Sequence, residues 1–174
     1  MISDAFNTDC NPESGGRPVL RSREKLSVLL FQPEIPQNTG NIARTCAATR
    51  TPLYLVGPLG FRITDKQLKR AGLDYWPYVR MKLYNDFDSA RADIRHSRLV
   101  YFSARASLLY YDFCFQPEDC LVFGSETGGL PEELLVSCPG DVVKVPIDRT
   151  RVRSLNLATT VGIALFEALR QLRH

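Results

Sequence analysis

The chain has 174 residues, of which 44% are hydrophobic and 24% charged, a composition typical of a globular protein with one sizeable core. Its formal net charge of +3 permits a polyanionic partner without requiring one. The apolar runs are too short to cross a membrane, and five cysteines with only two histidines argue against a metal site and for free thiols in a reducing cytoplasm.

The amino-terminal region divides into a tail and a first strand. Residues 1–25 contain Asn-Pro, Gly-Gly and Arg-Pro steps that break any periodicity, so we expect a disordered tail. Residues 26–31 are mostly apolar, which indicates a buried strand. A single folded domain is therefore expected over residues 26–174.

A helix is predicted from Asn41 to Thr49. Two prolines upstream favour an extended segment before it, and Asn38 or Thr39 is suited to cap its start. Asn41 and Arg44 lie three residues apart and therefore share a face near the helix start, where an anion can bind. A capped, solvated first turn explains these two residues equally well.

The next elements bring basic and aromatic residues together. Residues 53–56 are a predicted strand, and a helix is expected from Thr64 to Ala71. The basic residues in or beside this helix are Arg62, Lys66, Lys69 and Arg70. Tyr75 and Trp76 follow, and basic side chains beside aromatic ones suit a partner with phosphates and stackable bases. A solvated helix face with aromatic residues in the core is the alternative.

Strands and helices alternate along the rest of the chain. The predicted strands are residues 78–84, 99–103, 121–123 and 142–145, and the predicted helices are residues 86–94 and 131–138. This alternation is typical of one α/β domain with a mainly parallel sheet flanked by helices.

The stretch from Cys120 to Pro131 is the most informative one. Its short strand ends at Gly124, and the loop that follows contains Glu126 and a double glycine. The loop has neither the Lys-Ser/Thr pair of a P-loop nor the dinucleotide fingerprint. Ligands bind at the carboxyl ends of parallel strands, so the loop is a candidate binding site. An ordinary turn with a surface glutamate is the alternative.

A basic stretch and an apolar helix end the chain. Arg149, Arg151 and Arg153 precede Ser154, which is suited to cap a helix that runs to about Leu172. The apolar face of this helix consists of Leu157, Val161, Ala164, Leu165, Ala168, Leu169 and Leu172. Further apolar and small residues lie beside this face, so we expect the helix to pack on its own sheet and on a second subunit.

Three segments resemble the motifs of the SpoU–TrmD (SPOUT) methyltransferases. They are PEIPQNTGNIARTCA at 33–47, LVFGSETGGLP at 121–131 and RSLNLATTVGIALFEALRQ at 153–171. They occur in the order and at the spacing of that family. The segment GPLGFRITDKQLKRAGLDYW at 57–76 is also similar to the small, single-domain TrmL type of the family.

The resemblance implies a function and an assembly. It implies methyl transfer from S-adenosylmethionine to a ribose 2′-hydroxyl of tRNA, at cytidine or uridine 34 of leucine tRNAs, leaving S-adenosylhomocysteine. It also implies a cytoplasmic homodimer that is formed through the C-terminal helix, and a C-terminal trefoil knot around the cofactor. The alternatives are ribosomal RNA or another tRNA position as the substrate, and a non-catalytic RNA-binding or assembly protein.

The resemblance also implies roles for individual residues. The expected cofactor contacts are Phe102, Gly124, Val145, Ser154 and Leu155. The expected catalytic residues are Asn41, Arg44, Glu126, Ser154 and Asn156, and the expected phosphate contacts are Arg62, Lys66, Lys69, Arg70, Arg149, Arg151 and Arg153. We expect Arg44 to clamp a phosphate, because a guanidinium scarcely deprotonates. Asn41 is expected to hold the loop, and Glu126 either fixes the loop or contacts Arg44.

Overall fold

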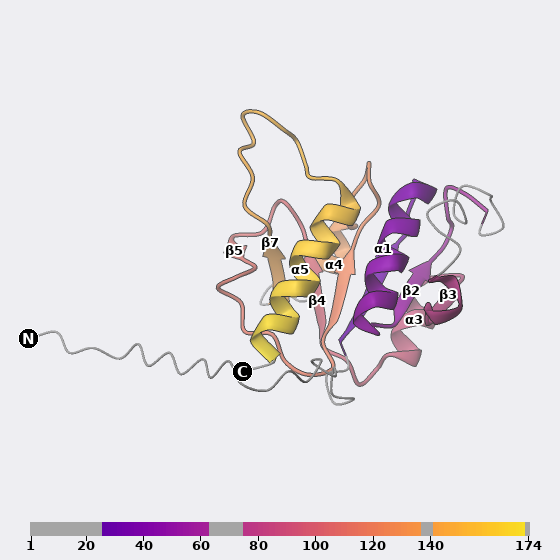
Figure 1. Cartoon of the computed structure of the whole chain (residues 1–174). Helices are drawn as coiled ribbons and strands as arrows, with labels where there is room; N and C mark the ends of the chain where they lie inside the picture. The colour runs from indigo at the N-terminus through magenta and orange to yellow at the C-terminus, as the bar shows by residue number, and fades with distance from the viewer. Residues whose placement is uncertain (1–25, 63–74, 137–140, 173–174) are drawn as a thin grey trace, which may run out of the picture.

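A parallel sheet organises the chain (Figure 1). The computed structural model describes residues 26–62, 75–136 and 141–172. Seven strands of these ranges form one sheet in the order β3-β2-β1-β6-β4-β7-β5, and all the strand pairs are parallel. The strands are β1 (Ser27–Phe31), β2 (Leu53–Val56), β3 (Met81–Tyr84), β4 (Leu99–Phe102), β5 (Leu108–Leu109), β6 (Cys120–Phe123) and β7 (Val142–Lys144). The predicted α/β fold with a mainly parallel sheet is confirmed.

Helices cover both faces of the sheet. The helices of the described residues are α1 (Pro36–Thr49), α3 (Phe87–Asp93), α4 (Glu132–Val136) and α5 (Leu157–Leu172), with a short 3-10 helix, η1 (Trp76–Tyr78). Helices α1 and α5 lie side by side on one face (Figure 1), where they share a core with alternate strand residues such as Val28 and Leu30. Helices α3 and α4 pack on the other face, against Leu29 and Val122. Because both faces are covered, the central strands are apolar throughout.

Helix α1 begins earlier than the sequence indicated. It starts at Pro36 instead of Asn41, with Ile35 as its N-cap residue and no side-chain cap from within the helix. Proline is favoured at the first helical position, because its fixed φ suits the helix and its missing N–H needs no partner there. Asn38 therefore lies inside the first turns and is buried, with 6% of its surface exposed.

Two other predicted boundaries also shift. The predicted strand at 78–84 is shortened to β3, since a 3-10 turn at η1 takes its beginning. Helix α5 starts at Leu157, and its cap is Asn156, whose Oδ1 accepts hydrogen bonds from the backbone N–H groups of Ala158 (2.9 Å) and Thr159 (3.3 Å). Ser154 lies before this cap and is exposed. The predicted tail at 1–25 and the predicted helix at 64–71 lie outside the described residues.

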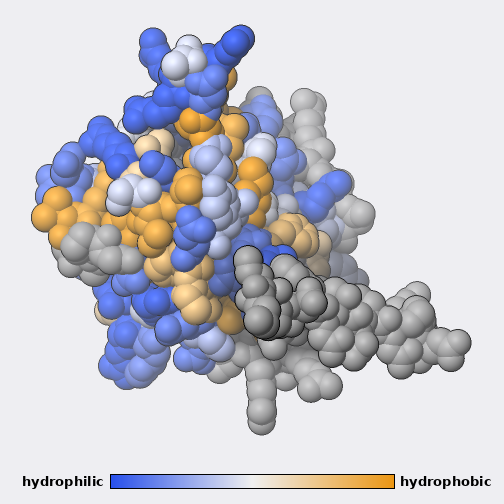
Figure 2. Space-filling model, turned by 90° about the vertical axis from the view of Figure 1, so that its left-hand side faces the viewer, coloured by the Kyte–Doolittle hydropathy of each residue, from blue (hydrophilic) through white to orange (hydrophobic). Residues whose placement is uncertain are grey.

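The C-terminal helix buries its predicted apolar face. Its fully buried residues are Val161, Ala164, Leu165, Ala168 and Leu169. Phe166 points away from this core and is 58% exposed. Figure 2 views the outer edge of the sheet, where hydrophobic side chains lie among hydrophilic ones. Strand β5 is the edge strand there, and its Leu108 is one of the exposed hydrophobic residues.

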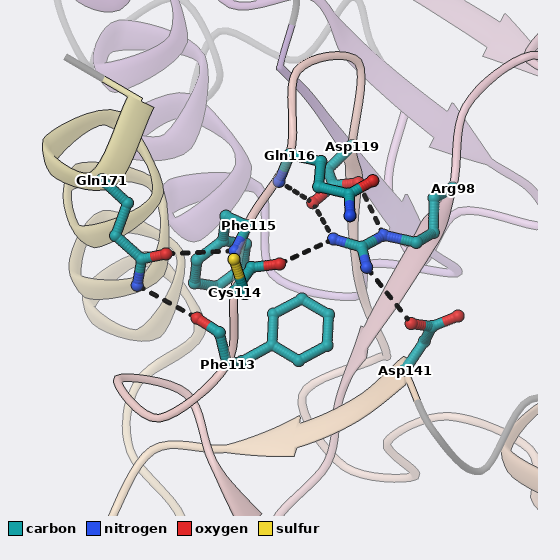
Figure 3. Close-up of polar contacts among 8 residues, drawn as sticks. All are labelled: Arg98, Phe113, Cys114, Phe115, Gln116, Asp119, Asp141 and Gln171. Atoms are coloured by element: carbon teal, nitrogen blue, oxygen red, sulfur yellow. Dashed lines mark hydrogen bonds and ion pairs between the residues drawn. The ribbon is translucent and has the colours of Figure 1, made fainter. Parts of the chain in front are cut away.

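A polar cluster holds the amino ends of the central strands (Figure 3). Arg98, just before β4, donates hydrogen bonds of 2.9 and 2.8 Å to the carboxylate of Asp119, which is almost completely buried just before β6. The Arg98 guanidinium also lies over the Phe113 ring, with 4.8 Å between Cζ and the ring centroid, and donates a hydrogen bond to the Cys114 carbonyl. Gln171 of α5 accepts a hydrogen bond from the Phe115 N–H at 3.0 Å. The cluster thus ties residues 113–119 to the sheet and to the end of α5.

The described cysteines are free thiols. Cys46 in α1 and Cys120 in β6 are buried, whereas Cys114 is exposed. Burial raises the pKa of both buried thiols to about 12, because the apolar surroundings disfavour the thiolate. The two buried thiols are therefore neutral core residues at physiological pH. In the described part of the chain, no helix is long and apolar enough to span a membrane, and no group of three metal-ligating side chains comes together.

Candidate active site

A cavity of about 690 Å³ opens at the carboxyl ends of the central strands. Three loops line it: residues 103–105 after β4, residues 124–130 after β6, and residues 145–157 after β7. Ile35 and Asn38, at the start of α1, also line it. The residues predicted to contact a cofactor all line this cavity: Phe102, Gly124, Val145, Ser154 and Leu155. The structure therefore brings together residues that are more than 50 positions apart in the sequence.

The loop after β6 is closed on itself. Ser125 and Gly129 exchange two backbone hydrogen bonds, of 3.2 and 3.0 Å, and the Ser125 hydroxyl accepts a third from the N–H of Gly128. A β-carbon on Gly124 would lie 2.0 Å from the carbonyl carbon of Gly129, so a glycine is required there. Gly129 has a φ of +69°, a conformation that side chains rarely adopt. The two glycines thus give the loop a compact, fixed shape.

Glu126 joins this loop to the start of α1. Its carboxylate accepts hydrogen bonds from the backbone N–H groups of Glu34 (2.8 Å) and Ile35 (3.2 Å) and from Asn38 Nδ2 (2.9 Å). A carboxylate at a helix N-terminus is stabilised by the unpaired N–H groups and by the helix dipole. These hydrogen bonds hold the loop against the start of α1. Glu126 thereby substitutes for the cap that Ile35 lacks.

Asn38 links the three motifs. Its Nδ2 donates to Glu126, and its Oδ1 accepts a hydrogen bond of 2.9 Å from Asn156 Nδ2. Asn156 in turn caps α5, so one buried amide connects the loop after β6 to the beginnings of α1 and α5. This role was not predicted from the sequence, because Asn38 was expected before the helix, as a possible cap. The motif itself contained the signal: an asparagine after a proline that can begin a helix.

Asn41 and Arg44 lie apart from these contacts. Both are exposed on α1, and neither lines the cavity. The contacts predicted for Asn41 are made by Asn38, one turn earlier. The Arg44 guanidinium lies over the Tyr75 ring, with 4.9 Å between Cζ and the ring centroid. The site therefore divides into a cavity lined by Glu126, Ser154 and Asn156, and an arginine on the neighbouring helix surface.

The predicted basic residues divide in the same way. Arg149 and Arg153 line the cavity, whereas Arg151 is exposed and its Nε lies 3.8 Å from an oxygen of Asp148. Arg62 is exposed on the loop after β2. Lys66, Lys69 and Arg70 lie outside the described residues. A further arginine, Arg105, lines the cavity and forms an exposed ion pair of 2.8 Å with Glu132 at the start of α4.

Known proteins resemble the chain over most of its length. The profile of the SpoU rRNA Methylase family matches residues 25–166. A relative from Synechocystis sp., named putative tRNA (cytidine(34)-2'-O)-methyltransferase, is 49% identical over 153 aligned residues, and the match covers 85% of this chain and 97% of the relative.

Two solved structures are informative. One, described as giving structural insights into the 2-OH methylation of C/U34 on tRNA, is 47% identical with a TM-score of 0.82, and the match covers 87% of this chain and 98% of that one. Another, an AdoMet-bound rRNA methyltransferase from Sinorhizobium meliloti, is 26% identical with a TM-score of 0.73, and the match covers 86% of this chain and 57% of that one.

Proposed function

The chain belongs to the SpoU rRNA methylase family, and on this premise we propose that it methylates the ribose 2′-hydroxyl of nucleotide 34, cytidine or uridine, in tRNA. The observation that carries this proposal is the convergence of the three motifs on one cavity, through the contacts of Asn38 with Glu126 and Asn156. The choice of position 34 is supported by the relatives that are named for this reaction and are nearly as long as this chain.

The cavity has the character needed to bind S-adenosylmethionine, the methyl donor of this family. Its lining combines apolar groups that suit an adenine ring, such as Phe102 and Leu155, with hydroxyl and amide groups that suit a ribose and an amino acid, such as Ser154 and Asn156. Gly129 lines the cavity, and a β-carbon there would meet no atom within 4 Å. When bound, the cofactor supplies an electrophilic methyl group.

The residues of the chain then have to present the ribose. A ribose hydroxyl is a weak nucleophile, so it must be aligned with the methyl group and must lose its proton. Ser154 and Asn156 line the cavity where the hydroxyl would arrive. Arg44 does not line it, which fits a role toward the RNA: its guanidinium holds the neighbouring phosphate, and that phosphate accepts the proton.

Further parts of the proposal concern the substrate and the assembly. Leucine tRNAs are the proposed substrates, as the resemblance to the TrmL type implies, in a cytoplasmic enzyme with a knotted C-terminal third. A homodimer forms through α5, whose Phe166 is exposed and whose Gly162 has open space beside it. Ala164, which belongs to the predicted apolar face, is buried in the protomer's own core.

A pair of synthetic tRNAs tests the proposed reaction. They differ only at nucleotide 34, which carries a 2′-hydroxyl in one and a 2′-deoxyribose in the other. Labelled S-adenosylmethionine should transfer its methyl group to the first alone. Equal labelling of both would move the target to another nucleotide, and labelling of ribosomal RNA fragments instead would favour the substrate that the family is named for. Absence of label from any RNA would favour a non-catalytic RNA-binding protein.

A further inference from the structure

One aspartate closes a turn in the loop that carries the cavity arginines. This loop connects β7 to α5 and extends beyond the carboxyl ends of the strands (Figure 1). Asp148 Oδ1 accepts hydrogen bonds from the backbone N–H (3.0 Å) and from the hydroxyl (2.5 Å) of Thr150. The Asp148 carbonyl accepts two more, from the N–H groups of Arg151 (3.1 Å) and Val152 (3.2 Å). Residues 148–152 therefore form a closed turn with helix-like hydrogen bonds.

The turn separates the three arginines of the loop. Arg149, Arg151 and Arg153 alternate in the sequence, so an extended chain would place all three on the same side. In a helical turn, residues four apart are neighbours, whereas residues two apart do not face each other. The structure follows the helical pattern, because Arg149 and Arg153 line the cavity and Arg151 does not. The Arg151 Nε lies instead 3.8 Å from Asp148 Oδ2.

The charge of Asp148 and the turn that it closes have opposite effects on RNA binding. Arg149 and Arg153 are exposed at the cavity, and guanidinium groups bind phosphates in a planar, bidentate way. Hydrogen bonds from Thr150 hold the pKa of Asp148 below its ordinary value, so its carboxylate is charged at physiological pH. A carboxylate repels phosphate, whereas a folded loop loses less conformational entropy on binding than a flexible one.

We propose that Asp148 is a positioning residue for RNA binding: it closes the turn that presents Arg149 and Arg153 together to one stretch of the RNA backbone. This inference rests on the proposed function, in which the edge of the cavity receives tRNA. Asp148 does not line the cavity. It acts through the two arginines, and the benefit of the closed turn exceeds the repulsion between its carboxylate and the phosphates.

The direction of the change in tRNA affinity tests the proposal. Asp148→Ala removes a negative charge together with the acceptor of both Thr150 hydrogen bonds. The Kd for tRNA should rise about tenfold, which corresponds to ordering about one more residue on binding. A Kd that falls, as the loss of a repulsive charge alone predicts, or that stays unchanged would overturn the proposal. Asp112→Ala is the charge-matched control, since Asp112 is exposed outside this loop and its replacement should change the Kd little.

Two further comparisons separate the turn from the charge. Asp148→Asn loses the charge but keeps an oxygen that accepts hydrogen bonds from Thr150, so it should bind tRNA at least as tightly as the wild type. In a background with Arg149 and Arg153 both replaced by alanine, Asp148→Ala should weaken binding no further, because the groups that it positions are gone. Equal weakening by Asp148→Asn and Asp148→Ala, or an equal loss in both backgrounds, would contradict the positioning role. Urea denaturation checks that each variant keeps the wild-type stability.

Hydrogen exchange measures the turn without RNA. The backbone N–H of Val152, which is bonded to the Asp148 carbonyl, should exchange faster in Asp148→Ala and at the wild-type rate in Asp148→Asn. Unchanged exchange in Asp148→Ala would show that the side chain does not hold the turn, even if the protein methylates nucleotide 34. If Asp148→Ala speeds exchange and weakens tRNA binding, but the methyl group is found on another nucleotide, the proposed function fails and the positioning role stands.

Discussion

At the scale of single residues, Asn38 joins the three motifs of the site, a role that was not predicted from the sequence. Its amide is buried between Glu126 and Asn156 and uses both of its ends. Replacing it by alanine removes two hydrogen bonds, each of which contributes about 0.5–1.5 kcal/mol to stability. The three motifs around the cavity are then no longer joined through one side chain.

Asn38→Ala should therefore lower the free energy of unfolding by about 1–3 kcal/mol and also weaken binding of S-adenosylmethionine. Urea denaturation and calorimetric titration measure the two effects. Asn41→Ala, an exposed change on the same helix, is the control and should stay within about 0.5 kcal/mol of the wild type. If the two variants behaved alike, the linking role assigned to Asn38 would be wrong.

Gly124 makes a second prediction at this scale. An alanine there would place its β-carbon 2.0 Å from the backbone of Gly129, so the closed loop must open. Gly128→Ala is a control within the same loop, because its β-carbon would meet only the Ser125 hydroxyl, at 3.2 Å. Binding of S-adenosylmethionine, measured by calorimetry, should be abolished in Gly124→Ala and largely kept in Gly128→Ala. Retained binding in Gly124→Ala would show that the loop's closed shape is not needed.

At the scale of elements, the sequence predicted the strands well and the helix boundaries less well. Buried strands such as β4 and β6 are short apolar runs bounded by polar residues, which a local pattern reveals. The start of α1 depends on Glu126, which is 91 residues away from Ile35 in the sequence. No local pattern contains that contact, so the helix was placed too late and Asn38 was mistaken for a cap. The loops of the cavity were found because glycines mark them locally.

The cluster around Arg98 lets us predict how much one junction between elements contributes. Asp119→Asn keeps the size of the side chain but removes the charge that pairs with Arg98 (Figure 3). The buried carboxylate also accepts the Gln116 N–H at 2.8 Å, so the whole turn before β6 depends on it. We expect a decrease of about 1–3 kcal/mol in the free energy of unfolding, measured by urea denaturation.

The control for this junction is Asp141→Asn. Asp141 Oδ1 lies 3.8 Å from Arg98 Nη1, and the Asp141 side chain is partly exposed. Its replacement should therefore lower the free energy of unfolding by at most about 1 kcal/mol. Methyl transfer by folded Asp119→Asn protein should stay near the wild-type rate, because the cluster lies at the amino ends of the strands, opposite the cavity. A selective loss of activity without a loss of stability would contradict this assignment.

At the scale of the whole molecule, the candidate active site and a stabilising ion-pair cluster lie at opposite ends of the strands of the parallel sheet. The carboxyl ends of β4, β6 and β7 carry the cavity and its arginines, while the amino ends carry the ion-pair cluster. The sequence predicted this separation only in part, since the alternation of elements gives a parallel sheet but not the order of its strands. That order places β6 between β1 and β4, which is what brings the motifs together.

RNA binding should reflect the charge at the cavity edge. Binding to phosphates releases counterions, so the affinity for tRNA should fall steeply with salt. Replacing Arg149 and Arg153 by alanine should reduce the slope of log K against log salt by about one for each phosphate that is no longer neutralised. Arg95 lies between α3 and β4, at the amino ends of the strands, so Arg95→Ala should leave the slope unchanged. Filter binding at several salt concentrations provides the slopes, and an unaltered slope in the double variant would remove both arginines from the RNA-binding surface.

Mapping the methyl group in natural RNA tests the proposed methylation of nucleotide 34 most directly. Total RNA from cells that lack the gene is incubated with the purified protein and labelled S-adenosylmethionine, and the labelled nucleotide is located by mass spectrometry. A 2′-O-methyl group is expected at nucleotide 34 of tRNA, with leucine tRNAs labelled most strongly. Label at another tRNA position or in ribosomal RNA, or no label from folded protein, would contradict the proposal.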